Sequence, residues 1–139
     1  MIEKFIIKDS GFHPFLISDS WQVAQLNYTV DQHIDNIKKV EVHFETDEVF
    51  VLLNGDAVLI TAKMENTGPV FNTELMKLGT VYNVPKNIWH NIAMRVGSEV
   101  LIVEKSNTHL GDYKYFDLNE EQISDLKKNV SKSFDEINI

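Results

Sequence analysis

The feature of this chain that most constrains its fold is a series of short, β-prone segments separated by turn residues. Each segment is rich in Val, Ile, Leu, Phe or Tyr, the residue types that favour a pleated, half-buried backbone. Many short strands at fairly even spacing predict a β-sandwich or a small barrel. The predicted strands are residues 4–8, 21–29, 38–44, 49–53, 57–63, 70–78, 80–84, 91–96 and 99–106.

The strongest turn signal is Asn54-Gly55, which stands between two apolar runs. Both residue types tolerate positive φ, as tight hairpin turns require. The pair therefore predicts a hairpin between segments 49–53 and 57–63, with both strands in one sheet.

The C-terminal tail changes from strand-like to helical periodicity. Asn119 followed by Gln122 is a capping-box pattern, which is typical of a helix start. The apolar residues that follow recur at helical spacing: Ile123, Leu126, Val130 and Phe134. We expect one amphipathic helix over about residues 119–136, packed on the outside of the sheets.

Composition narrows the class of protein. The 139 residues, 43% of them hydrophobic, fit a single domain, residues 1–139, with a substantial core. The formal net charge of −8 disfavours binding to nucleic acid and to anionic membrane surfaces. Arg95 is the single arginine, so a site that grips a diphosphate through several arginines is excluded. Disulfides and thiolate metal sites are excluded because there is no cysteine.

The chain also shows no targeting or membrane signal. Charges interrupt the apolar residues of its first segment, unlike a signal peptide, and no apolar stretch is long enough to span a bilayer. We therefore expect a cytoplasmic protein.

The stretch from Val40 to Gly55, VEVHFETDEVFVLLNG, concentrates acid around one histidine. Strand alternation puts Glu41, His43 and Glu45 on one face. After a corner, Glu48 shares its face with Phe50 and Leu52. This segment resembles the first motif of the cupin family, because Glu48 and Gly55 have the motif's spacing and His43 takes the place of its second histidine.

A later stretch, GTVYNVPKNIWHNIAM, runs from Gly79 to Met94. It resembles the second cupin motif, because Gly79, Pro85 and His90 fall at the motif's intervals. Asn87 stands where the motif has glycine, and Met94 where it has asparagine. The two motifs occur in the family's order, and the resemblance covers about residues 38–106. It implies an all-β fold, a double-stranded β-helix or RmlC-like jelly-roll barrel, to which the C-terminal helix is added.

In cupins, the histidines and the glutamate of these motifs hold one metal ion inside the barrel. Carried over to this chain, the resemblance implies His43, Glu48 and His90 as ligands, with Glu41 in the place of the first histidine. Two imidazoles and two carboxylates suit Fe(II), Mn(II), Zn(II) or Ni(II). Without a metal, the two glutamates would repel each other, and at least one would take up a proton. The acid cluster therefore holds either a cation or a proton.

Other residues are expected around this site. An inward-facing pocket is predicted to be small and largely apolar. Its candidate residues are Phe50, Leu52, Ile92, Met94 and Tyr82. Glu104 is a candidate catalytic base. Arg95 is expected to face outward, and His13, His33 and His109 to be exposed in loops.

The resemblance leaves three functions open. The first is a metal-dependent enzyme, of oxygenase or isomerase type, acting on a small organic molecule. The second is a non-catalytic module that binds or senses a small ligand without metal. The third is a metal-free sugar-nucleotide isomerase, which the shortage of arginine opposes. By analogy with small cupins we also expect a homodimer. The apolar residues within segments 5–7 and 12–17 are the candidates for its interface.

Overall fold

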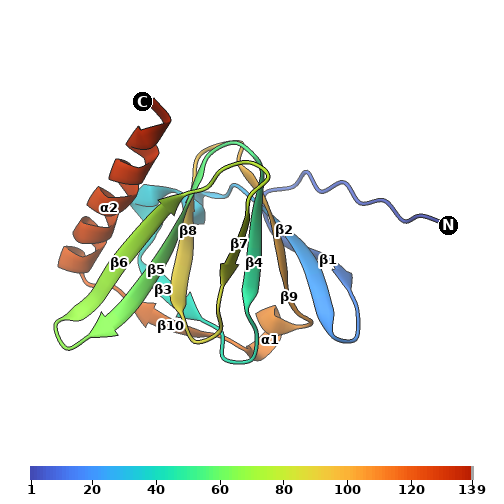
Figure 1. Ribbon diagram of the computed structural model, residues 1–139, viewed down its shortest axis with the longest axis horizontal. Helices are drawn as coiled ribbons and strands as arrows, with labels where there is room; N and C mark the ends of the chain where they lie inside the picture. The colour runs from blue at the N-terminus through green and yellow to red at the C-terminus, as the bar shows by residue number, and fades with distance from the viewer. Residues whose placement is uncertain (139) are drawn as a thin grey trace.

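Two five-stranded antiparallel sheets face each other in the computed structural model, which describes residues 1–138 (Figure 1). Ile139, the last residue of the predicted domain, lies outside the described residues. The first sheet has the order β1 (Gly11–Ile17), β2 (Trp21–Asn27), β9 (Glu99–Lys105), β4 (Glu48–Asn54) and β7 (Val81–Val84). The second has the order β10 (Lys114–Asp117), β3 (Lys39–Val42), β8 (Trp89–Met94), β5 (Ala57–Glu65) and β6 (Gly68–Leu75).

The chain changes sheet at most of its connections. Only β1–β2 and β5–β6 are hairpins within one sheet, whereas every other consecutive pair of the described strands crosses from one sheet to the other. This alternation is that of a jelly roll, which confirms the predicted fold class. Short helical segments lie between strands: η1 (Val30–Gln32), η2 (Ile34–Asn36) and α1 (Thr108–Gly111).

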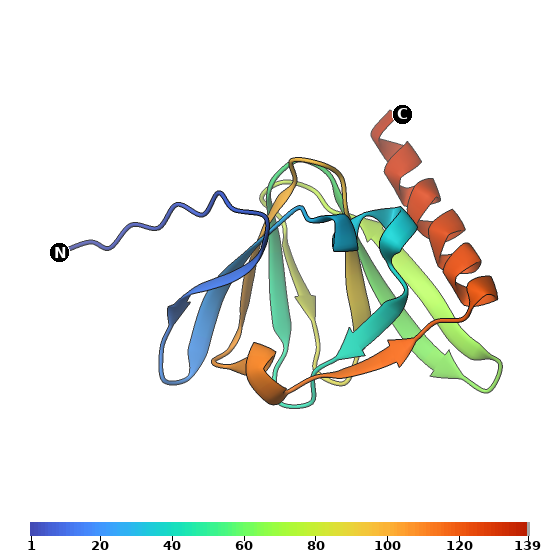
Figure 2. The same cartoon turned by 180° about the vertical axis from the view of Figure 1, so that it is seen from behind.

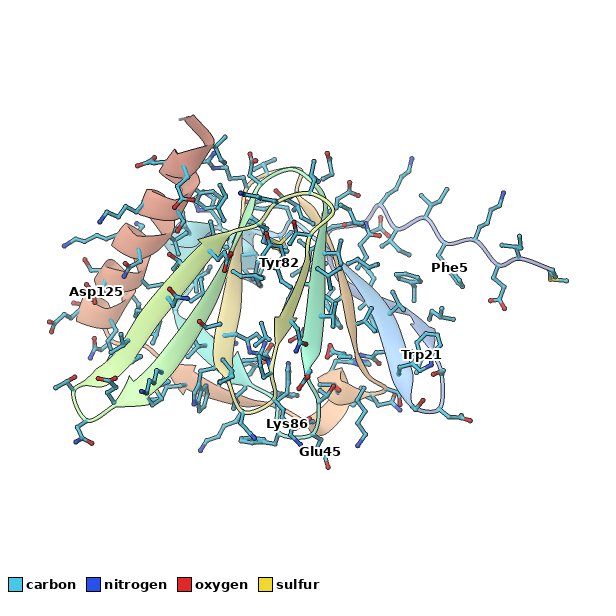
Figure 3. The ribbon with its side chains drawn as sticks, in the orientation of Figure 1. Phe5, Trp21, Glu45, Tyr82, Lys86 and Asp125 are labelled. Atoms are coloured by element: carbon cyan, nitrogen blue, oxygen red, sulfur yellow. The ribbon has the colours of Figure 1, made fainter. Side chains whose placement is uncertain are left out.

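Most predicted strands are present, with ends that differ by no more than three residues. The prediction for residues 4–8 is wrong, because this arm forms no strand. Figure 3 shows the arm reaching out past β1, and the ring of Phe5 lies 5.1 Å from that of Phe15 on β1. The side chains of Gln25 and Asn27 donate to the carbonyl of Ile7, at 3.2 and 3.1 Å, in place of a strand ladder. Strands β1 and β10 were not predicted as strands. β10 has only four residues and is recognisable only by its pairing with β3.

The hairpin predicted at Asn54-Gly55 is also wrong, since β4 and β5 belong to different sheets. The turn is held by the β8–β9 connection: the amide of Asp56 donates to Ser98 Oγ at 2.9 Å, and that hydroxyl donates to the carbonyl of Asp56 at 2.7 Å. Gly55 has a φ of 81°, and a Cβ built on it would lie 2.7 Å from the Cα of Ser98. Glycine is therefore required here to let two connections cross closely.

Two apolar cores hold the layers together. The first fills the space between the sheets and includes Phe50, Leu52, Ile92 and Met94. The second lies between the outer face of β5 and β8 and the helix α2 (Glu120–Asp135), which continues into η3 (Glu136–Asn138). Figure 2 shows α2 beside β6 at one edge of the molecule, remote from the N-terminal arm.

The helix α2 forms as its sequence predicts. Asn119 accepts from the amide of Gln122 at 2.8 Å, and the Gln122 side chain accepts from the amide of Asn119 at 2.9 Å. Leu126, Val130 and Phe134 are buried and Ile123 is half-buried, while Asp125 points away from the sheets (Figure 3). Neither α2 nor any other helix among residues 1–138 combines the length and apolar character needed to cross a membrane.

Candidate metal centre

Four predicted ligands come together between the sheets. Glu41 is on β3, His43 follows the end of that strand, Glu48 begins β4, and His90 is on β8. One ligand atom from each lies within 4.8 Å of the others. The β3–β8 pairing sets Glu41 directly opposite His90, and β4 brings Glu48 from the facing sheet. The site is therefore assembled across the barrel, from segments up to about fifty residues apart.

The carboxylate of Glu48 is at the centre of the group. Its Oε1 atom lies 3.0 Å from His43 Nε2 and 2.8 Å from His90 Nε2. Glu41 Oε1 is farther away, at 3.7 Å from the first nitrogen and 4.0 Å from the second. Glu48 and both histidines are buried, whereas Glu41 is one-third exposed and borders the cavity.

The other nitrogen of each imidazole is bound to the backbone. His43 Nδ1 lies 2.7 Å from the carbonyl of Asp112, and His90 Nδ1 lies 2.9 Å from the carbonyl of Ile88. A carbonyl can only accept, so each Nδ1 carries a proton. In a neutral ring, the unprotonated Nε2 then points at the carboxylate of Glu48. Fixing a histidine tautomer in this way is typical of metal ligands.

This arrangement sets lone pairs against one another unless something positive lies between them. In the metal-free protein a proton has this role. Burial opposes a charge on His43, but the hydrogen bond and the charge of Glu48 outweigh it and raise the pKa of His43 to about 9. The same balance raises the pKa of His90. Burial alone would raise the pKa of Glu48, yet the two histidines lower it to about 2.

Two further carboxyl groups at the site have a raised pKa. Burial, followed by the charge of Glu48, raises the pKa of Glu41. Burial and the same charge raise the pKa of Glu104, on β9, to about 8. Glu104 lines the cavity beside the site and is 6% exposed. The protonated carboxyl of Glu104 can therefore donate a hydrogen bond at neutral pH.

The turn before His90 explains one departure from the cupin pattern. Asn87 has a φ of 68°, in the left-handed region that glycine adopts most easily and that asparagine tolerates. Its amide donates to the carbonyl of His43 at 2.7 Å. Asparagine thus preserves the turn of the second motif and ties it to the loop that carries His43.

Asp112, which lies outside both motifs and was not predicted as a site residue, holds the loop that carries His43. The carboxylate of Asp112 accepts from the amides of Phe44 and Glu45, at 2.9 and 3.0 Å, while its carbonyl accepts from His43. Asp112 follows α1, near the C-terminal end of the barrel, and no local pattern marks it. On the other side, Asp47 accepts from the amide of Lys86 at 3.0 Å. Glu45 and Lys86 lie at the same end of the barrel (Figure 3).

The site opens into a cavity of about 600 Å³. Of the predicted pocket residues, Phe50 and Ile92 line it. Leu52 and Met94 are instead buried in the core between the sheets, and Tyr82 packs against that core. The hydroxyl of Tyr82 accepts from the amide of Lys77 at 2.9 Å, and Tyr82 is not among the residues that line the cavity.

The outer part of the cavity contains residues that the sequence did not indicate. These additional lining residues are Phe12, Lys39, His109, Tyr113 and Tyr115. The prediction that His13 and His109 are exposed in loops is wrong. His13 is half-buried on β1, and His109 is half-buried on α1, with Gln22 Nε2 at 3.1 Å from its Nδ1. Arg95 is exposed as predicted, and its guanidinium lies over the ring of Phe134, 4.3 Å away.

The donor set fits a divalent metal ion. An ion that binds nitrogen and oxygen at about 2.1 Å separates neighbouring donors by about 3 to 4 Å. The distances from the two Nε2 atoms to the nearest carboxylate oxygens span 2.8 to 4.0 Å. Two carboxylates would balance the charge of the ion, and the Nδ1 contacts would hold both imidazoles in the tautomer that binds it.

Comparison with known proteins gives the fold. No family model matches the sequence, and no curated protein matches it. The TDP-quinovose 3,4-ketoisomerase WlaRB from Campylobacter jejuni is 14% identical, with a TM-score of 0.52 over 73% of this chain and 72% of that one. A variant of PAC13 from Streptomyces, with uridine, is 12% identical, with a TM-score of 0.52 over 86% of this chain and 96% of that one.

The chain has a cupin, RmlC-like fold. A cupin-2 domain protein from Shewanella frigidimarina also matches, at 16% identity and a TM-score of 0.48, over 72% of this chain and 84% of that one. Within this barrel, the four residues at the motifs' ligand positions converge between the sheets.

Proposed function

We propose that this cupin binds one divalent metal ion through Glu41, His43, Glu48 and His90, and that it acts on a small organic molecule in the adjoining cavity. The observation that carries the proposal is the pair of imidazoles whose Nδ1 atoms are held by the carbonyls of Asp112 and Ile88. Both Nε2 atoms therefore face the same carboxylate oxygen of Glu48.

A bound divalent ion would supply Lewis acidity and positions for an oxygen-bearing ligand. The chain's own residues would define the rest of the site. Phe50, Ile92 and Ile102 line the inner cavity and would exclude water from a bound ligand. Glu104 would hold a proton next to the ligand and donate or accept a hydrogen bond. Oxygenation and isomerisation both remain candidate reactions for such a site.

The direct test is metal content by plasma mass spectrometry on protein purified without an affinity tag. A His43→Ala, His90→Ala double variant serves as the comparison. We expect close to one metal per chain in the wild type and a loss of that metal in the double variant. Absence of metal from the wild type, with no uptake of Fe(II), Mn(II), Zn(II) or Ni(II), would contradict the proposal.

The second candidate is a barrel that binds a small ligand without metal. It is favoured by the pKa pattern, because a proton on His43 satisfies the same lone pairs that a cation would. Ligand binding that survives complete removal of metal by a chelator would support this function. A sugar-nucleotide substrate has less support, because its diphosphate would need a bidentate cationic group in the cavity. Arg95, the single arginine, does not line the cavity and stacks on Phe134 instead.

We also propose a homodimer. The N-terminal arm and the edge strand β1 expose large apolar side chains, among them Ile2, Phe5, Ile6 and Ile17. Burying such side chains against a second copy would remove them from water. Light scattering during size-exclusion chromatography, with a variant that lacks residues 1–8, tests this. An identical dimer without the arm would exclude its role.

A further inference from the structure

The cavity wall beside the candidate metal centre carries a lysine on the same strand face as two of the proposed ligands. Lys39 and Glu41 are two residues apart on β3, and His43 follows at the same interval. All three line the cavity. A strand advances about 3.3 Å per residue, so the Lys39 position is about 7 Å from that of Glu41 along the wall.

The side chain of Lys39 is held in place by an aromatic ring. Its Nζ atom lies 3.8 Å from the centre of the Tyr115 ring, on β10. Tyr115 is the cross-strand partner of Glu41, and its ring lies 5.2 Å from that of Tyr113. A cation over a tyrosine ring is attracted by the π-electrons, but it remains able to bind an anion on its other side.

The charge of Lys39 has no carboxylate partner in the structure. Among residues 1–138, no carboxylate oxygen lies within 4.0 Å of its Nζ atom. By contrast, Lys127 pairs with Asp35 at 2.7 Å. Glu48, the most buried acid nearby, is engaged by the two histidines. A cation at the edge of a cavity, with no carboxylate paired to it, is suited to an anionic ligand.

We infer that Lys39, on the platform of Tyr115, binds the carboxylate of a small organic acid whose other end reaches the Glu41–His43–Glu48–His90 group. The second half of this inference rests on the proposed function. The length of the wall suits a molecule with two polar ends that are separated by a few carbon atoms. Tyr113 and Tyr115 would contact the carbon chain between those ends.

A carboxylate fits better than a nucleoside diphosphate. A diphosphate carries several negative charges and is usually held by more than one cation or by arginine forks. The cavity wall also includes the acidic residues Asp31 and Glu48, which would repel a multiply charged group. A single lysine matches a single carboxylate, and the proposed metal would balance Glu41 and Glu48.

The test is calorimetric titration of succinate and glutarate, with their monoamides as probes that lack one charge. The proteins are the wild type, Lys39→Met, Lys39→Arg and Tyr115→Phe, each loaded with the metal that the wild type retains. We expect Lys39→Met to weaken diacid binding at least about tenfold and monoamide binding much less. Lys39→Arg should restore most of the affinity, and Tyr115→Phe should retain it because the ring remains.

Metal affinity, measured for each variant by chelator competition, separates this inference from the proposed function. Unchanged metal affinity with a selective loss of diacid binding in Lys39→Met would support the lysine subsite. Equal binding of diacid and monoamide, equal binding by wild type and Lys39→Met, or no diacid binding at all would overturn it and leave the metal site standing. Tighter binding of thymidine diphosphate than of the diacids would also overturn it. If the wild type takes up no metal, the same comparison on the metal-free protein decides the subsite alone.

Discussion

At the scale of single residues, the tautomers of two histidines determine what the site can hold. With both Nδ1 protons donated to the carbonyls of Asp112 and Ile88, the two Nε2 atoms meet the carboxylate of Glu48. Three acceptors cannot share this space without a proton or a cation. Metal and proton are therefore alternative occupants, and binding of one must release the other.

The affinity for metal should consequently rise with pH. His43 has a pKa of about 9 in the metal-free protein, so it is protonated at pH 7 and a metal ion must displace that proton. We expect the apparent affinity for Mn(II) to increase by about tenfold per pH unit between pH 6 and 8 for each proton that the metal displaces. Calorimetry in two buffers of different ionisation enthalpy should show release of at least one proton per metal. Affinity independent of pH, without proton release, would contradict this mechanism.

Asp112 should affect the metal although it is not a ligand. In Asp112→Asn one carboxylate oxygen is replaced by an NH₂ group, which cannot accept from the amide of Phe44 or Glu45. Loss of that hydrogen bond should shift residue 112, and with it the backbone carbonyl that accepts from His43. We expect a loss of metal affinity of about tenfold or more, measured by chelator competition. Asp35→Asn is the control, because it breaks an ion pair with Lys127 without touching the His43 loop. Equal losses in both variants would indicate general destabilisation.

The raised pKa of Glu104 predicts how stability depends on pH in the metal-free protein. Below about pH 4.5 the carboxyl of Glu104 is protonated in both the folded and the unfolded chain. Between about pH 4.5 and pH 8 it is protonated only in the folded chain. The unfolded state therefore binds fewer protons, so the free energy of unfolding falls as pH rises between these values. Glutamine does not titrate, so Glu104→Gln removes this pH dependence. The difference in free energy of unfolding, variant minus wild type, should be on the order of 2 kcal/mol larger at pH 7 than at pH 5.

Urea denaturation of wild type and Glu104→Gln at pH 5, 6, 7 and 8 measures this difference. The advantage of the variant should grow with pH and level off near pH 8. A difference that is constant across the series would mean that Glu104 has no raised pKa.

At the scale of elements, the connections rather than the strands decide the fold. The turn at Gly55 joins the two sheets because Ser98, from the β8–β9 connection, binds the backbone of Asp56. An Asn-Gly pair specifies a tight reversal, but it does not specify whether the next strand returns to the same sheet. That choice depends on contacts with a segment about forty residues away.

Gly55→Ala should therefore be strongly destabilising. The alanine backbone would have to keep a φ of 81°, and its Cβ would lie 2.7 Å from the Cα of Ser98. We expect a loss of about 3 kcal/mol in urea denaturation, from backbone strain and steric overlap together. Gly79→Ala is the matched control: its φ is 77°, but beyond its chain neighbours no atom of residues 1–138 lies within 4 Å of the new Cβ. It should cost only about 1 kcal/mol, and equal costs would rule out a close approach at Gly55.

At the scale of the whole molecule, the metal site joins the two sheets across the barrel. Ligands from β3 and β8 in one sheet and from β4 in the other would be crosslinked by a bound ion. An ion that binds only the folded state stabilises that state by mass action. The proposed site should therefore be detectable as a change in global stability as well as in metal content.

We expect saturating metal to raise the melting temperature of the wild type by about 5 °C or more in scanning calorimetry. The His43→Ala, His90→Ala variant should show no rise, and a chelator should reverse the rise in the wild type. A similar rise in both proteins would place the metal elsewhere on the chain.

The sequence by itself determined the class of fold, the C-terminal helix and the group of four polar residues. These depend on local information: strand-like composition, the Asn119–Gln122 cap, and the intervals around His43, Glu48 and His90. Asn87 could even stand for the motif's glycine, because both residue types adopt the left-handed backbone that the turn needs.

Only the tertiary structure decided which strands are neighbours and what surrounds the site. Residues 4–8 look like a strand but find no partner, whereas β10 becomes a strand only through its pairing with β3. His109 and Tyr115 reach the cavity, and Asp112 reaches the loop that carries His43, from a segment with no motif of its own. The physical reason is that hydrogen-bond partners and burial are set by segments distant in sequence, and only folding brings those segments together.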